Sequence, residues 1–104
     1  MTGTLSTSGT RFGYSYETLA HNFPDKMMHP YILTIPKEIK QVPLFEHEGE
    51  EMFLVMEGKV NFLHGNKEFL LEEGDCIHFD ASLPHRGFAV DCDRAKCLIV
   101  IYNP

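Results

Sequence analysis

The sequence predicts an all-β fold, a single small barrel or sandwich with almost no helix. Short runs of alternating or continuously apolar residues recur along the 104 residues, and glycine-bearing turns separate them. No stretch carries a sustained helical period. Closing such strands into a barrel also removes the edges that these apolar runs would otherwise expose.

The first half of the chain predicts strands separated by proline-containing loops. Tyr14–Ala20 carries aromatic and β-branched residues, which favour a strand over a short helical turn. Asn22–Pro30 is predicted to be a loop, because it contains two prolines and an aspartate. Tyr31–Ile35 is predicted to be a strand that stops at Pro36. Gln41–His47 is predicted to be the next strand, with its odd positions on one face.

The middle of the chain predicts a buried strand and a hairpin. Glu51–Glu57 is apolar on both faces, as expected of a strand that is covered on both sides. Val60–His64 and Lys67–Leu71 flank Gly65-Asn66, a strong signal for a β-hairpin.

The last third predicts three more strands. Cys76–Phe79 alternates apolar and polar side chains, and Asp80–Pro84 forms a loop that delivers His85. Arg86–Val90 is the following strand. Lys96–Tyr102 is the most hydrophobic stretch, and it is too short to indicate a helix.

Length and composition predict one soluble domain. Residues 1–13 are small and polar and predict a flexible leader or linker, followed by a barrel domain over residues 14–104. The net charge of −6 and the scattered basic residues argue against nucleic-acid binding by this chain. No apolar run is long enough for a membrane span, and no signal peptide is evident.

Three cysteines without a C-x-x-C pair indicate a reducing compartment, so we predict a cytoplasmic protein. Free buried thiols are favoured for Cys92 and Cys97. The alternative is a disulfide between the two if they face each other across a hairpin.

Two segments carry the chemistry. His47 and Glu51 flank one turn, and His85 follows a proline-stiffened loop far along the chain. Two imidazoles and one carboxylate are a ligand set suited to a first-row divalent metal if a closed sheet brings them together. The same three groups can instead hydrogen-bond one another, because a protonated imidazole would compensate a buried carboxylate. The sequence leaves both alternatives open.

At these residues the chain resembles the cupins, a family of small antiparallel jelly-roll barrels. The family's first motif, G-x5-H-x-H-x3–4-E-x6-G, is matched in its second half by His47, Glu51 and Gly58. Its second motif, G-x5-P-x-G-x2-H-x3-N, is matched by Gly74 and His85. The resemblance covers about residues 31–102 and implies a double-stranded β-helix, or jelly-roll barrel, with His47, Glu51 and His85 as the site.

The departures from the motifs reduce the family's metal shell of three histidines and one glutamate. Phe45 stands where the first histidine is expected, and Ile39 replaces the opening glycine. In the second motif, Asp80, Ser82 and Ala89 replace proline, glycine and asparagine. The remaining pattern is similar to the C-terminal cupin domains of helix-turn-helix transcriptional regulators, which are thought to sense small effectors.

Two functions follow from this resemblance. One is a regulatory effector-binding module, whose ligand pocket contains Phe45, His47, Glu51, Phe53 and His85. It would act in cis or in trans to a DNA-binding unit. The alternative is a metal-dependent dioxygenase, isomerase or decarboxylase acting on a small polar metabolite, with Fe, Mn, Ni or Zn as the ion. No general acid or base stands out, which favours the first function.

The remaining polar residues have simpler explanations. Four other histidines, His21, His29, His64 and His78, are expected at the surface or at an interface. Arg86 alternates away from His85 and is expected to be a surface or salt-bridging residue. Apolar side chains on both faces of the central strands favour a C2 homodimer.

Overall fold

The computed structural model describes residues 3, 6–11, 14–37 and 43–103. Within these ranges the chain contains strands and no helix, as the sequence predicted. The strands are β1 (Thr7–Arg11), β2 (Tyr14–Thr18), β3 (Met28–Pro36), β4 (Glu50–Glu57), β5 (Val60–His64), β6 (Lys67–Leu71), β7 (Cys76–Asp80), β8 (His85–Ala89) and β9 (Arg94–Tyr102).

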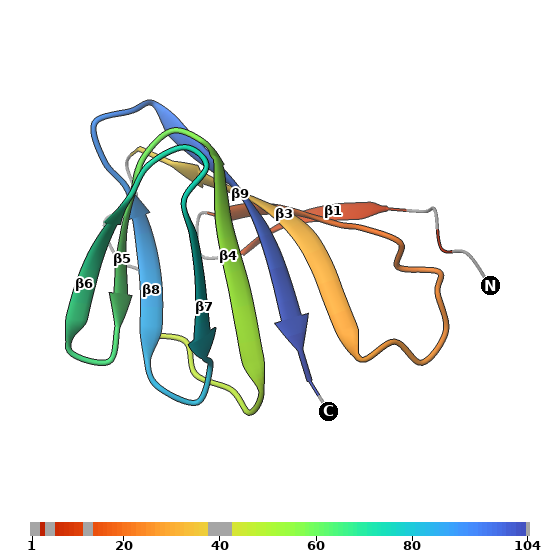
Figure 1. Cartoon of the computed structure of the whole chain (residues 1–104). Helices are drawn as coiled ribbons and strands as arrows, with labels where there is room; N and C mark the ends of the chain where they lie inside the picture. The colour runs from red at the N-terminus through yellow and green to blue at the C-terminus, as the bar shows by residue number, and fades with distance from the viewer. Residues whose placement is uncertain (1–2, 4–5, 12–13, 38–42, 104) are drawn as a thin grey trace.

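The strands form two antiparallel sheets that face each other. The larger sheet has the order β1-β2-β3-β9-β4-β7 and the smaller has the order β6-β5-β8. From β4 onward the chain passes repeatedly between the sheets, as Figure 1 shows: β4, β7 and β9 belong to the larger sheet, and β5, β6 and β8 to the smaller. This confirms the predicted all-β jelly roll.

The core lies between the inner faces of the two sheets. Alternate residues of the strands point inward, giving β4 and β9 a regular pattern of buried and partly exposed positions. Phe62 of β5 packs against Phe53 of β4 and Phe79 of β7, with ring centres 5.0 Å apart in both cases. These aromatic contacts tie the smaller sheet to the larger one.

Two turn glycines, Gly58 and Gly74, have positive φ angles of 88° and 86° but different surroundings. A Cβ atom at Gly58 would lie 2.6 Å from the carbonyl oxygen of Arg94, whereas one at Gly74 would meet nothing within 4 Å. We expect Gly74→Ala to lower the free energy of unfolding by about 1–3 kcal/mol through backbone strain alone. Gly58→Ala should cost clearly more, because backbone must also move. Equal losses in urea denaturation would contradict this explanation.

The N-terminal part of the fold differs from the prediction. Thr7–Arg11, which the sequence predicts to be part of a flexible leader, forms β1 and pairs with the whole of β2. The prediction was therefore wrong for these residues. Strand β3 also begins within the predicted loop, at Met28, and it includes both Pro30 and Pro36. The pairing of β3 with β9 along its full length outweighs the local preference of the prolines.

The predicted strand Gln41–His47 is also not formed as expected. Its first two residues lie outside the described residues, and between Pro43 and His47 the structure has one isolated bridge, from Phe45 to His85. The other predicted strands lie within three residues of their observed bounds, and the hairpin Val60–Leu71 has the predicted bounds.

The three cysteines are free thiols, so the bridge between Cys92 and Cys97 that the sequence left open is not present. Burial raises the pKa of the Cys97 thiol to about 12, and neighbouring Cys92 adds to this rise. A membrane-spanning helix is not found in the part of the chain that the structure describes.

Candidate metal and ligand site

Backbone pairing brings the three predicted ligands together from separate segments. Glu51 is the second residue of β4, and His85 is the first residue of β8. The amide of Phe45 donates to the carbonyl of His85 at 2.8 Å, and the amide of His85 returns the bond at 2.9 Å. Two residues after Phe45, the amide of His47 donates to the carbonyl of Ala81 at 2.8 Å. These bonds fix the His47 segment against the loop that leads into His85.

The side chains converge on one oxygen atom. Oε1 of Glu51 lies 3.1 Å from Nε2 of His47 and 3.7 Å from Nε2 of His85. The two imidazole rings stand edge to face, with centres 5.7 Å apart. One ligand atom from each residue lies within 4.8 Å of the others, so the cluster can hold a metal ion. Glu51 and His85 are buried, whereas His47 is partly exposed at the edge of the cluster.

The hydrogen bonds of the Nδ1 atoms show which ring nitrogen carries the hydrogen in His47 and in His85. Nδ1–H of His85 donates to the carbonyl of Leu83 at 2.9 Å, and Nδ1–H of His47 donates to the carbonyl of Glu48 at 3.2 Å. A carbonyl can only accept, so both Nδ1 atoms carry hydrogen and the neutral rings present lone pairs at Nε2. This is the usual orientation of metal-binding histidines.

The cluster therefore requires positive charge at its centre. Two imidazole lone pairs and a carboxylate oxygen would repel one another if nothing lay between them. A proton shared by His47 and Glu51 satisfies the 3.1 Å contact, whereas a divalent cation can satisfy all three atoms. The donor set and its orientation thus fit a metal ion, and the hydrogen-bonded form is the state expected without one.

Burial changes the proton affinity of two of the three groups in opposite directions. It raises the pKa of the Glu51 carboxyl, and the hydrogen bond and charge of His47 oppose this rise. Burial also lowers the pKa of His85, which keeps its imidazole neutral and able to bind a metal.

The cluster forms part of the wall of a cavity of about 410 Å³ between the sheets. This volume is within the range of about 300–1,000 Å³ that is typical of small-molecule sites. The five predicted pocket residues all line it: Phe45, His47, Glu51, Phe53 and His85. Five more apolar side chains from β3, β5 and β9 line it, Leu33, Ile35, Phe62, Ile99 and Ile101, and the surface of the cavity is mainly apolar.

Sequence reasoning missed five polar residues that line the same cavity: Tyr14, Tyr16, Thr18, Tyr31 and Arg86. The hydroxyl of Tyr14 donates to the carbonyl of Gly87 at 2.7 Å, linking β2 to β8. Burial raises the pKa of Tyr31 above its ordinary range, and the nearby charge of Glu51 adds to this. The alternation of Tyr14 and Tyr16 along one strand face was the available signal for two of these residues.

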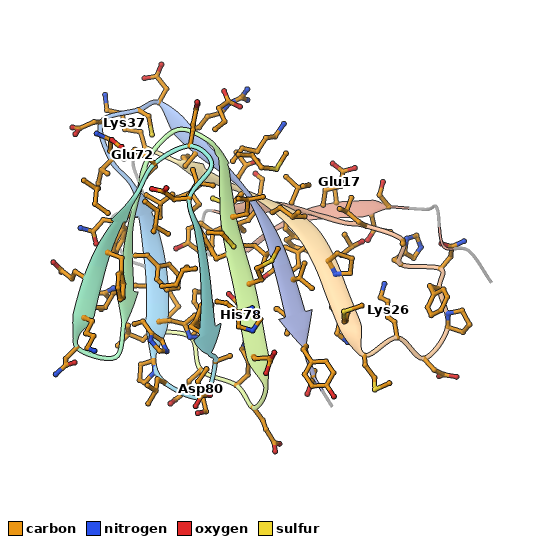
Figure 2. The ribbon with its side chains drawn as sticks, in the orientation of Figure 1. Glu17, Lys26, Lys37, Glu72, His78 and Asp80 are labelled. Atoms are coloured by element: carbon orange, nitrogen blue, oxygen red, sulfur yellow. The ribbon has the colours of Figure 1, made fainter. Side chains whose placement is uncertain are left out.

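Other titratable residues lie outside the cluster. His78 projects from β7 on the outer side of the larger sheet (Figure 2), and its Nε2–H donates to Glu50 at 2.9 Å. His64 donates from Nε2 to the carbonyl of Asp80 at 2.9 Å. Both histidines therefore have structural hydrogen bonds.

Comparisons with known proteins agree with this architecture. A family model for the cupin domain matches residues 31–102, which is more than half of the chain. The chain therefore belongs to the cupin domain family. No curated protein gives a significant sequence match.

Several solved structures share the fold. A conserved protein of unknown function from Streptococcus pyogenes has 18% identity and a TM-score of 0.73, with 91% of this chain and 78% of that chain covered. Hydroxypropylphosphonic acid epoxidase from S. wedmorenis, in complex with fosfomycin, has 22% identity and a TM-score of 0.75, with coverage of 93% and 55%.

A third similar structure is an HTH_3 family transcriptional regulator from Vibrio cholerae. It has 20% identity and a TM-score of 0.73, with coverage of 88% of this chain and 52% of the regulator. The chain thus spans about half the length of the epoxidase and of the regulator. At these identities, the likeness establishes the fold.

Proposed function

We propose that this chain is a small-molecule-binding cupin domain of a regulatory kind, in which His47, Glu51 and His85 hold one divalent metal ion. The observation that carries the proposal is the convergence of Nε2, Oε1 and Nε2 on the wall of a mainly apolar cavity. The metal would bind a polar group of the ligand, and the apolar wall would hold its body. The structural likeness to a transcriptional regulator supports the regulatory role.

The metal would be Fe, Mn, Ni or Zn, because two imidazoles and a carboxylate suit these ions. The epoxidase with the same fold has been solved in an iron(II) form, which supports this choice. Bound metal would supply a Lewis acid with coordination positions left open. His47 and His85 would be its neutral donors and Glu51 its anionic donor.

Metal binding can be tested with a matched pair of histidine variants. We expect His85→Ala to lose the rise in melting temperature that these divalent metals give to chelator-stripped protein, and to purify with less metal by elemental analysis. His78→Ala is the control, because His78 also faces a glutamate, at 2.9 Å, but lies on the surface. An equal metal response in both variants would argue against the proposed ligands.

The ligand and its regulatory role need a separate test. A thermal-shift screen of the metal-loaded protein should find stabilising compounds among amino acids, polyamines, sugars and organic acids. If no compound in these classes binds, the effector role fails.

The second candidate is a metal-dependent enzyme of the dioxygenase, isomerase or decarboxylase type. The observation that favours it is the phenol of Tyr31, which lines the cavity and is a protonated hydrogen-bond donor at neutral pH; burial and the charge of Glu51 raise its pKa further. Such a hydroxyl can donate a proton or a hydrogen bond to a bound group. Turnover of a bound ligand by the metal-loaded wild type, lost in Tyr31→Phe with binding retained, would favour this candidate.

We also propose that the domain forms a C2 homodimer through the outer face of the larger sheet, in a cytoplasmic protein. Neighbouring strands place Ile32, Leu98 and Leu54 side by side, with Val100 next to them, and all are partly exposed. Light scattering at micromolar concentration should give the mass of a dimer, and Leu98→Glu should give a monomer. A wild-type monomer would contradict the proposal.

A further inference from the structure

Arg86, on the smaller sheet, is partly buried and lines the cavity, although alternation along β8 directs it away from His85. β8 is the outermost strand of that sheet, so a long side chain can reach around its edge. Arg86 lines the cavity, and its Nε atom is buried. Its guanidinium carbon lies 5.2 Å from the centre of the Phe88 ring, a cation–π contact that fixes its position.

The charge of Arg86 acts at the end of the cavity where Tyr14 bridges β2 and β8. Arg86 directly precedes Gly87, whose carbonyl accepts the hydrogen bond of the Tyr14 hydroxyl at 2.7 Å. Burial raises the pKa of Tyr14 to about 12, and the hydrogen bond to Gly87 and the positive charge of Arg86 oppose that rise. Among the described residues that line the cavity, Arg86 is the one permanent cation and Glu51 is the one carboxylate. The two lie on opposite sheets, and a metal at Glu51 would offset its negative charge.

We propose that the cavity selects an organic anion with an apolar body, and that Arg86 is the residue that recognises the anionic group. The inference rests on the proposed ligand-binding function and names its ligand class. A carboxylate or similar oxyanion would accept hydrogen bonds from the guanidinium, whose planar fork matches two oxygens. The aromatic and branched side chains between the sheets would enclose the remainder.

Two probes of almost equal size can test this specificity: 3-phenylpropionate and the neutral 3-phenylpropanamide. Binding is measured in chelator, so that the carboxylate gains nothing from a metal. We expect the acid to bind about tenfold or more tightly than the amide, as a charge-assisted hydrogen bond provides. Arg86→Gln should remove this preference, and Arg86→Lys should keep part of it because the charge remains.

The control is Arg94→Gln, because Arg94 is an exposed arginine that pairs with Glu57 and does not line the cavity. It should keep the preference for the acid. The side-chain Nε–H resonance of Arg86 should also shift when the acid binds, and a purely structural arginine would not show this.

Three results would overturn the inference: equal binding of both probes, an unchanged preference in Arg86→Gln, or no binding of the acid at millimolar concentration. If neutral compounds from the wider screen still bind, or the metal response still depends on His85, the proposed function stands and only the ligand class is wrong. If no compound binds and no metal stabilises the protein, both fail together.

Discussion

Replacing Glu51 with glutamine is expected to stabilise the metal-free protein at neutral pH and to abolish its stabilisation by metal. The carboxylate is buried in a mainly apolar cavity, and burial raises its pKa. Glutamine keeps the shape without the charge, so the desolvation cost disappears, while the anionic ligand is lost. With metal at 100 times its dissociation constant, the wild type should gain about 2.7 kcal/mol and the variant close to nothing.

The pH dependence of this difference follows from the direction of the pKa shift. A carboxyl whose pKa is higher in the folded state contributes stability below its unfolded pKa, and this contribution is lost as pH rises through the folded pKa. The advantage of Glu51→Gln in chelator should therefore grow as pH increases from about 4. His85 acts in the other direction, because its lowered pKa makes both proteins lose stability as pH falls below its ordinary value.

Urea denaturation between pH 4 and pH 8, with chelator and then with metal, measures both effects. Glu50→Gln is the control, since the neighbouring Glu50 is exposed and pairs with a surface histidine. The free energy of unfolding of Glu50→Gln should stay close to that of the wild type, both with chelator and with metal. A Glu51→Gln protein that is less stable than the wild type in chelator would mean that the hydrogen bond from His47 outweighs the burial cost. A retained metal response would remove Glu51 from the ligand set.

The sequence was most informative where local chemistry and tertiary structure agree. Gly65-Asn66 encodes a tight turn, and the flanking hairpin has the predicted bounds. The spacing of His47, Glu51 and His85 matched a family motif, and the structure brings the three together. Such spacings are informative because backbone pairing, here between the segments of His47 and His85, converts positions in the sequence into positions in space.

The residues that sequence reasoning misplaced depend on long-range contacts. Thr7–Arg11 has a linker-like composition, and only pairing with β2 makes it a strand. Arg86 alternates away from His85 and contacts Phe88 two residues on, but β8 is at the edge of its sheet, and Arg86 still lines the cavity. Tyr31 belongs to the cavity because β3 lies next to β9, which comes from the far end of the chain. No local pattern contains this information.

The second large effect, on stability, is expected from substituting Phe62, the aromatic residue that contacts both the core and the site. It is 1% exposed, and its ring lies between those of Phe53 and Phe79. Phe62→Ala should lower the free energy of unfolding by about 3–5 kcal/mol, because both the burial and the packing of a large ring are lost. A typical domain has only about 5–15 kcal/mol in total, so this variant should be close to unfolding.

Phe62 should also affect metal binding without touching the metal. The ring of His85 stacks on Phe62, with centres 6.3 Å apart, and meets the edge of Phe79 at 4.9 Å. Phe62→Leu fills most of the space and should fold, yet it leaves one side of the imidazole unsupported. We expect a several-fold weaker metal affinity by calorimetry, because ligands held by packing lose less entropy on binding.

Phe69→Ala is the control, since Phe69 pairs with Phe62 across β5 and β6 but is 37% exposed. If Phe62→Leu binds metal as tightly as the wild type, the hydrogen bond from His85 to Leu83 is sufficient to orient the imidazole without the aromatic support.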